Sequence, residues 1–127
     1  LNFQNLMNFH IKKNNDFSIA THNRTVKIDY GVLKSDNSNN LLRYIEKPHY
    51  DYMVSMGINI VKKSSIKKFI NEEKYLDIPD LVKELIKNKS RILCYKETCD
   101  WLDIGRVDDY EEASSILLRN KNKYLID

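Results

Sequence analysis

Glycine, proline and cysteine are scarce in this sequence, and it contains no long apolar run. Three glycines are too few for a glycine-rich loop that cradles phosphates. The two cysteines, Cys94 and Cys99, lack a matching pair of ligands for a zinc site, so we expect ordinary reduced thiols. No stretch approaches the roughly 20 apolar residues that a membrane helix needs. We therefore expect no membrane association, and the cytoplasm is the expected compartment.

The charge of the chain is mild and mixed in sign. It carries 21 basic and 18 acidic residues, a net charge of +3 over 127 residues. A nucleic-acid-binding protein concentrates basic residues on one face, and this distribution argues against that class. A mild positive net charge is still compatible with the binding of a small anionic ligand. The amino terminus lacks the charged flank and apolar stretch of a signal peptide. The chain also lacks an initiator Met, which leads us to expect a piece of a longer protein.

Periodicity and turn residues predict a mixture of strands and helices, and hence the α/β class. Helices are expected over residues 3–15, from a cap at Ser64–Ser65 to about 70, from a start at 77–80 onward, and over 107–118. Strands are expected over residues 17–21, 26–34, 41–45, 54–61 and 92–95, with a hairpin turn at 35–40. We expect one domain over residues 1–118 and a polar tail over 119–127.

Three short segments are hard to explain by packing alone. Gly31 stands inside a predicted strand, where glycine indicates either a close approach to the backbone or a bulge. Glu46 and Lys47 end another strand just before Pro48. A carboxylate can accept two hydrogen bonds from a vicinal diol, and an ammonium is a compact phosphate partner. The alternative for this pair is solvated surface charge.

The third segment is Trp101–Gly105, in which Asp103 stands among apolar residues. A carboxylate in such surroundings needs a partner or a cation. Mg²⁺ takes one or two carboxylates together with phosphate oxygens and water. The alternative is an aspartate that caps the following helix.

Six segments in this order resemble the carboxy-terminal half of the nucleoside-triphosphate transferases that make nucleotide sugars, such as mannose-1-phosphate guanylyltransferase. The similar segments are residues 5–10, 28–32, 42–48, 55–59, 75–80 and 101–110. The resemblance implies a Rossmann-like sheet with flanking helices. It also implies transfer of a nucleoside monophosphate from an NTP to a sugar-1-phosphate, with release of pyrophosphate.

The resemblance also assigns roles to individual residues. Glu46 would bind sugar hydroxyls and Lys47 the sugar phosphate, while Gly31 and Gly57 would let the backbone close on the sugar. Asp103 would be one of two Mg²⁺ ligands and thus part of the catalytic machinery. The resemblance of residues 77–80, at the start of a helix, favours a mannose-like or heptose-like sugar as the substrate.

The chain departs from the family pattern in ways that limit what it is expected to do. The family's nucleotide-binding loop and first metal-binding aspartate are not among these residues, so we expect them upstream of Leu1 and expect the 127 residues alone to be inactive. Ser55 stands where the family often has Asn. The alternatives are a non-catalytic module that binds sugar phosphates and a structural α/β domain with chance motifs. A second copy of the chain is a further candidate partner, in a homo-oligomer.

Overall fold

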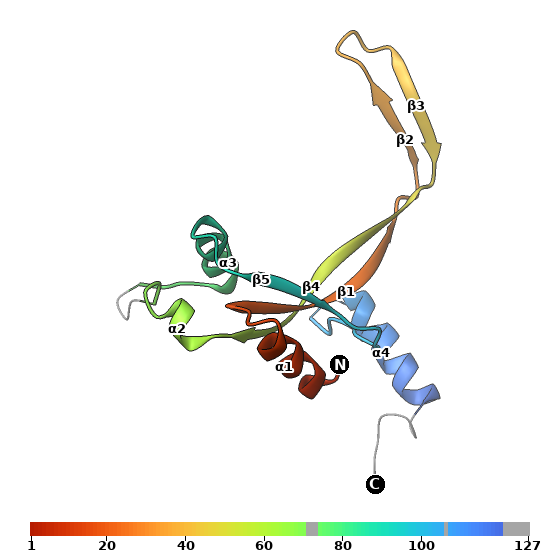
Figure 1. Cartoon of the computed structure of the whole chain (residues 1–127). Helices are drawn as coiled ribbons and strands as arrows, with labels where there is room; N and C mark the ends of the chain where they lie inside the picture. The colour runs from red at the N-terminus through yellow and green to blue at the C-terminus, as the bar shows by residue number, and fades with distance from the viewer. Residues whose placement is uncertain (71–73, 106, 121–127) are drawn as a thin grey trace. The chain divides into compact units, whose positions relative to one another are not determined.

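The computed structural model describes residues 1–70, 74–105 and 107–120 (Figure 1). These residues form two compact units. The larger runs from Asn2 to Thr98, and the smaller combines Leu1 with the described residues from Cys99 onward. The larger unit contains α1 (Phe3–Lys12), β1 (Phe17–Lys27), β2 (Gly31–Ser35), β3 (Leu41–Glu46), β4 (His49–Val61), α2 (Lys63–Ile66), α3 (Ile78–Lys87) and β5 (Ile92–Lys96). The smaller unit contains α4 (Val107–Arg119).

The larger unit is built on a three-stranded sheet in the order β4-β1-β5. β1 runs antiparallel to β4 and parallel to β5, where Phe17 pairs with Ile92. Only the first part of β1, up to Thr21, has a partner on both sides, because β5 ends at Lys96. Beyond it, β1 and β4 continue as a two-stranded ribbon to the pair Lys27–His49. The hairpin of β2 and β3 forms a separate two-stranded sheet.

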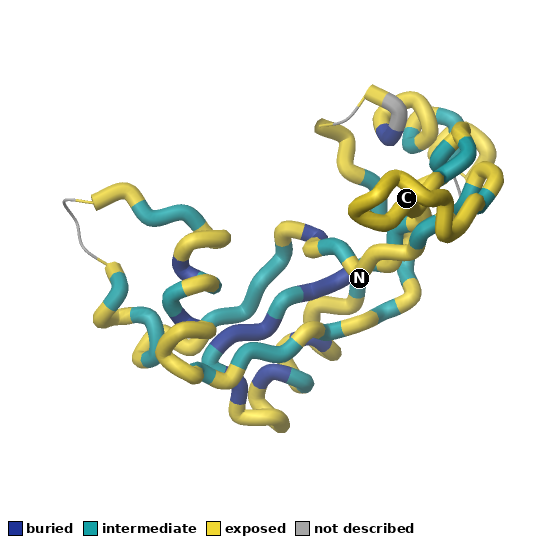
Figure 2. The backbone as a smooth tube through the Cα atoms, turned by 90° about the horizontal axis from the view of Figure 1, so that it is seen from above, coloured by how far each residue is buried: buried dark blue, intermediate teal, exposed yellow. Residues whose placement is uncertain are grey.

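Helices cover both faces of the three-stranded sheet. Successive strand residues point to opposite faces. Phe17 faces α3, where it packs with Leu81 and Leu85 in a hydrophobic core cluster. Ser18, one residue on, faces α1, where its hydroxyl lies 2.8 Å from Nδ1 of the buried His10. Figure 2 shows how the buried residues gather along these elements. The core therefore sits on both sides of the first half of β1.

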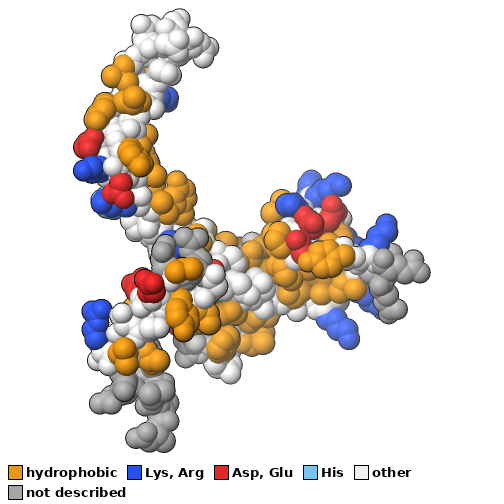
Figure 3. All heavy atoms as spheres, turned by 180° about the vertical axis from the view of Figure 1, so that it is seen from behind, with side chains coloured by type: hydrophobic (Ala, Val, Ile, Leu, Met, Phe, Trp, Pro, Cys, Tyr) orange, Lys and Arg blue, Asp and Glu red, His pale blue; other side chains and the backbone are white. Residues whose placement is uncertain are grey.

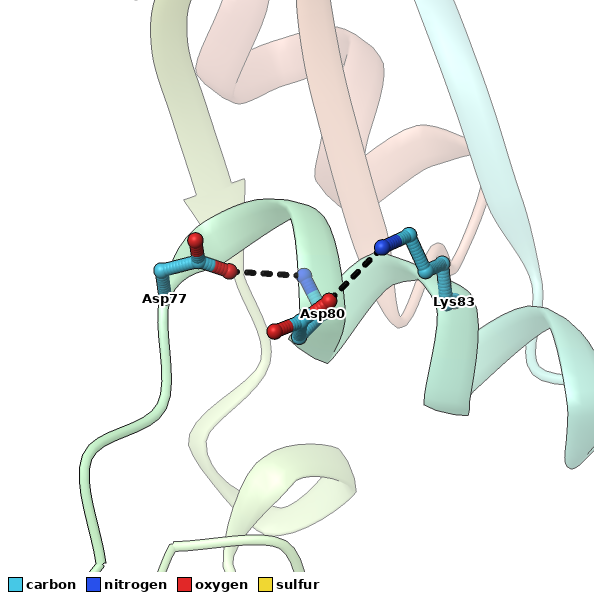
Figure 4. A network of polar contacts seen from close by, with 3 residues as sticks. All are labelled: Asp77, Asp80 and Lys83. Carbon is cyan, nitrogen blue, oxygen red and sulfur yellow. Dashed lines mark hydrogen bonds and ion pairs between the residues drawn. The ribbon is translucent and has the colours of Figure 1, made fainter.

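The start of α3 follows directly from its sequence. Asp77 is the N-cap, and its carboxylate accepts the backbone N–H of Asp80 at 2.9 Å (Figure 4). Pro79 lies in the first turn, where its missing N–H is not needed. Lys83 lies one turn after Asp80 and forms an ion pair with it at 2.7 Å. The predicted helix start at 77–80 is confirmed.

Several predicted boundaries are wrong, and the structure gives the reason for each. Val26 does not begin a hairpin strand, because it pairs with Tyr50 of β4 and belongs to β1. The hairpin strand begins only at Gly31. The first helix ends at Lys12, and Asn14 then adopts a left-handed conformation with a φ of 47°.

The short helix α2 also differs from the sequence-based expectation. Its N-cap is Lys62, whose side chain makes no capping hydrogen bond in the described structure. The Ser65 hydroxyl instead donates to the carboxylate of Asp16. The predicted cap at Ser64–Ser65 is therefore wrong. A longer-range partner was available to the hydroxyl, and helical spacing cannot reveal it.

The strand predicted over 54–61 begins earlier, at His49, because β4 continues its pairing with β1 up to Lys27, and the helix predicted to reach about residue 70 ends at Ile66. The hairpin turn, the strands at 41–45 and 92–95 and the helix from Val107 are confirmed. The α/β class is confirmed as well. Of the predicted polar tail, Arg119 ends α4, and residues 121–127 lie outside the described residues. Within the part of the chain that is described, no helix has the length and apolarity to span a membrane. Cys94 and Cys99 are free thiols there.

Candidate functional site

The hairpin brings Gly31 and Glu46 together. They are direct partners in the antiparallel ladder between β2 and β3, and the next pair on the same face is Leu33 with Tyr44. Residues directly opposite each other in such a ladder have Cβ positions about 5 Å apart. Glu46 therefore presents its carboxylate beside a backbone position that has no side chain.

The space next to Gly31 is occupied by the ring of Tyr44. A Cβ added to Gly31 would lie 2.4 Å from the Tyr44 hydroxyl oxygen and 2.6 Å from Cζ. The same hydroxyl donates a hydrogen bond of 2.7 Å to Oε2 of Glu46. The register shift of this hairpin lies between Lys34 and Ser35. The glycine at position 31 thus serves a close approach, by an aromatic ring of the same chain, and not a bulge.

The bond between Tyr44 and Glu46 also affects proton affinity. The hydrogen bond to the carboxylate, followed by its negative charge, raises the pKa of the Tyr44 phenol above 10.0. The phenol therefore stays protonated, and can donate this hydrogen bond, over the whole physiological pH range. Glu46 stays otherwise exposed to solvent, as does the following Lys47.

Lys47 adopts a left-handed backbone conformation, with a φ of 42°. Its N–H donates to the carbonyl of Tyr30 at 3.2 Å, which closes the base of the hairpin. This conformation costs a non-glycine residue roughly 1–2 kcal/mol, and the residue before a proline normally prefers an extended backbone. Lys47 precedes Pro48. Its side chain is therefore kept at a position where glycine or asparagine would be less strained.

The other positive-φ residues have local explanations. Asn14 and Asn39 are of the type that tolerates this region. Lys89, with a φ of 55°, follows the C-cap of α3, and Ser90 N–H donates to the Leu85 carbonyl at 3.0 Å. That is a common way for a helix to end. Lys47 has no such helix, so its strain is a reason to look for a function at this residue.

Gly57 lies in the other sheet, in β4. It has a φ of +75°, and a Cβ there would meet no atom within 4 Å. The pairing with β1 shifts at this point, because Ile19 pairs with Asn59 but Thr21 with Ser55. The N–H of Gly57 bonds to the Ser55 hydroxyl at 3.2 Å. Gly57 is thus the turning point of a bulge, and the hairpin residues do not share its sheet.

Asp103 belongs to the smaller unit and is exposed. Its Oδ1 accepts the N–H of Gly105 at 3.1 Å, and its own N–H donates to Oδ2 of Asp109 at 3.1 Å. The Asp109 side chain is almost fully buried. Since α4 begins at Val107, Asp103 stands too far ahead of the helix to be its N-cap. The two bonds fix the turn that carries the Asp103 carboxylate.

The described residues contain no group of three or more His, Cys, Asp or Glu side chains that could hold a metal ion. Asp103 offers one exposed carboxylate, with Oδ1 engaged by a backbone N–H. Mg²⁺ commonly binds one or two carboxylates and takes its other ligands from water and phosphate. Asp103 fits the role of one such ligand, and a second carboxylate would have to come from elsewhere.

The larger unit also carries a pocket. It is lined by Asp16, Ser64, Ser65, Lys67, Lys68 and Ser90. None of the predicted site residues contributes to it. The residues that sequence reasoning singled out thus lie on an exposed hairpin, a bulge and a turn. Figure 3 shows the exposed apolar side chains of the hairpin beside charged ones; the apolar residues are Leu33, Leu41, Leu42 and Tyr44.

Sequence reasoning missed two residues that the structure places next to the predicted ones. Tyr44 stands two positions before Glu46, and in a strand that spacing puts both on one face. The sequence therefore contained a signal that Tyr44 lies beside Glu46. Asp109 lies in the first turn of α4, and its carboxylate accepts the backbone N–H of Asp103. No spacing rule indicates that bond.

Residues 1–120 match the family model described as nucleotidyl transferase. The chain belongs to this family of nucleotidyltransferases, as its sequence motifs predicted. Among curated relatives, it is 24% identical over 132 residues to a glucose-1-phosphate adenylyltransferase of Clostridium acetobutylicum, covering 96% of this chain and 35% of the relative. A glucose-1-phosphate adenylyltransferase of Lachnospira eligens is 27% identical over 128 residues, covering 93% and 30%.

Solved structures show the same fold. The crystal structure of HddC from Yersinia pseudotuberculosis superposes with a TM-score of 0.58 at 20% identity, covering 92% of this chain and 50% of that one. Its complex with GMP-PN gives a TM-score of 0.55 at 19% identity, with the same coverage. The predicted nucleotidyltransferase-type sheet with flanking helices is confirmed. The chain spans about a third of the length of the curated relatives it matches.

Proposed function

We propose that the protein transfers a nucleoside monophosphate from an NTP to a sugar-1-phosphate, and that this chain supplies the sugar-phosphate side of the site. The observation that carries the proposal is the base of the hairpin. There Glu46 lies opposite Gly31, and the strained Lys47 follows directly. Family membership and the glucose-1-phosphate adenylyltransferases among the relatives support it.

Each residue then has a defined task. The Glu46 carboxylate accepts hydrogen bonds from neighbouring sugar hydroxyls, and the Lys47 ammonium neutralises charge on the sugar phosphate. A phosphate oxygen of the sugar-1-phosphate attacks the α-phosphorus of the NTP. A new P–O bond forms while the bond to pyrophosphate breaks. Such a transfer depends on positioning and charge neutralisation, which these two side chains provide for one of the substrates.

Asp103 is proposed to hold Mg²⁺, which would neutralise phosphate charge when bound. Its carboxylate is kept in place by two hydrogen bonds, one from the Gly105 N–H to Asp103 Oδ1 and one from the Asp103 N–H to Asp109 Oδ2. The nucleotide-binding loop and the second carboxylate are proposed to come from sequence outside these 127 residues. We accordingly expect no turnover by the 127 residues alone.

The test uses the native full-length protein and measures pyrophosphate release with Mg²⁺, pairing ATP, GTP, UTP or dTTP with glucose-1-phosphate or mannose-1-phosphate. This panel separates the glucose-1-phosphate of the relatives from the mannose-like sugar that the 77–80 segment favours. Asp103→Asn should lower the rate by about 100-fold, because a charge that acts on the reacting phosphates is lost. The control Glu112→Gln removes an exposed carboxylate from α4 and should leave the rate unchanged.

Glu46→Gln should raise KM for the sugar-1-phosphate, while KM for the NTP stays the same. Asp103→Asn at the wild-type rate would remove that residue from the metal site. If the native protein binds sugar-1-phosphates in calorimetry but releases no pyrophosphate with any pair, the non-catalytic binding module becomes the better description.

A further inference from the structure

Tyr44 connects two of the residues assigned to the sugar. Its hydroxyl donates to Oε2 of Glu46 at 2.7 Å, and its ring fills the space beside Gly31. Residues two apart in a strand lie about 7 Å apart, so this bond requires the Tyr44 side chain to lean along the strand. The lean takes the phenol across Gly31, because the cross-strand partner of Glu46 is Gly31.

Only glycine permits this arrangement. Any side chain at position 31 would place its Cβ 2.4 Å from the Tyr44 hydroxyl oxygen and 3.0 Å from Cε2. The distance to the hydroxyl oxygen is shorter than Cβ atoms tolerate, so the tyrosine side chain would have to move away and release Glu46. Gly31, Tyr44 and Glu46 therefore act as one unit, which we call the tyrosine clamp.

The clamp is not a packing device. The Tyr44 side chain is 59% exposed, and its neighbours Leu33 and Leu42 are exposed to a similar extent. Burial therefore gives little reason for an aromatic residue to hold this one orientation. What the orientation does achieve is to restrict the Glu46 carboxylate, which would otherwise be a freely rotating surface side chain.

We propose that Tyr44 is a positioning residue, which fixes the Glu46 carboxylate so that its remaining lone pairs, above all on Oε1, face the hydroxyls of a sugar. This inference rests on the proposed function, because it presumes that Glu46 binds the sugar. An ionised carboxylate offers about four acceptor sites, and the phenol uses one. Gly31 then contributes by making room for Tyr44, and contact between its backbone and the sugar is not needed.

The two explanations of Gly31 differ in a measurable way. If Gly31 acts through Tyr44, a substitution there matters only while the phenol is present. If the Gly31 backbone touches the sugar, a substitution there is harmful whatever stands at position 44. A double-mutant cycle separates these cases, because residues that act as a unit show non-additive effects.

The experiment compares Tyr44→Phe, Gly31→Ala and the double variant in the native full-length protein. KM for glucose-1-phosphate, KM for ATP and kcat are measured for each variant. Freeing one charged side chain should raise KM for the sugar-1-phosphate about 3- to 10-fold, with kcat and KM for ATP within twofold of wild type. Gly31→Ala should match Tyr44→Phe, and the double variant should be no worse than either. The control Tyr52→Phe removes another exposed phenol, on β4, and should change nothing.

The outcomes are distinct. An unchanged or lowered KM in Tyr44→Phe, alongside a raised KM in Glu46→Gln, overturns the clamp and leaves the proposed function standing. An unchanged KM in Glu46→Gln overturns the sugar site itself. Additive effects in the double variant return Gly31 to direct contact with the sugar.

A second measurement does not depend on activity. Titration of the Tyr44 phenol, followed by NMR of ¹³C-labelled tyrosine, should show a lower pKa in Glu46→Gln than in the wild-type protein, because the carboxylate is the main cause of the raised value. Equal pKa values in the two proteins would mean that the clamp does not form in solution.

Discussion

Replacing Lys47 by glycine should raise the free energy of unfolding of the protein and lower its affinity for the sugar-1-phosphate. The residue has a φ of 42° and stands before Pro48, and both features disfavour a side chain at that position. Relief of the left-handed conformation is worth roughly 1–2 kcal/mol. Glycine also adds freedom to the unfolded chain, which takes back about 0.4–1 kcal/mol. The expected net gain is therefore about 0.8 kcal/mol, within a range of roughly 0–1.6 kcal/mol.

The matched control is Lys89→Gly, which also replaces an exposed lysine of left-handed backbone, with a φ of 55°. Both variants should shift the urea midpoint upward with an unchanged slope, which is the sign of a change in stability alone. Only Lys47→Gly should raise KM for the sugar-1-phosphate. A destabilised Lys47→Gly variant would refute the strain argument. Equal KM values in the two variants would refute the link between that strain and phosphate binding.

Three further predictions concern single elements. Gly57→Ala should cost about 1–2 kcal/mol in urea unfolding, through its φ of +75° alone, since nothing lies near enough to clash; an unchanged midpoint would mean that the bulge relaxes. Asp77→Ala should cost about 1 kcal/mol by removing the N-cap of α3, whereas Asp80→Ala, which breaks only an exposed ion pair, should cost less. Burial lowers the pKa of His10 below 6.5, so the unfolded chain takes up this proton more readily. The free energy of unfolding should then fall as pH drops from about 6.5 through the folded-state pKa, and His10→Gln should flatten that slope between pH 8 and 5.

The sequence predicted those parts of the fold that depend on neighbouring residues. The start of α3 could be predicted because cap, proline and apolar spacing lie within a few positions of each other. The length of β1 could not, because Val26 pairs with Tyr50, and alternation alone does not identify a partner. The prediction of the cap of α2 was wrong for a similar reason, since the Ser65 hydroxyl bonds to Asp16, 49 positions away in the sequence.

The candidate site divides in the same way. The pairing of Gly31 with Glu46 follows from a hairpin whose turn was visible in the sequence. The orientation of Tyr44 across Gly31 does not, because it depends on the rotamer of one side chain. The positive φ of Lys47 was also hidden, since lysine gives no hint of it and the following proline argues against it. The roles assigned to Glu46, Lys47 and Asp103 stay predictions until the variants are measured.

The topology of the sheet has a consequence for synthesis on the ribosome. β1 is the central strand, yet its parallel partner comes last, since Phe17 pairs with Ile92, 75 positions later (92 − 17). At about 5–20 residues per second, the delay between these residues is roughly 4–15 s. During that time one edge of β1 can pair with β4. The N–H and C=O groups of its other edge stay unpaired and can form hydrogen bonds with a strand of another chain. Slow codons between residues 62 and 91 would lengthen this exposure, and fast ones would protect the nascent chain from aggregation.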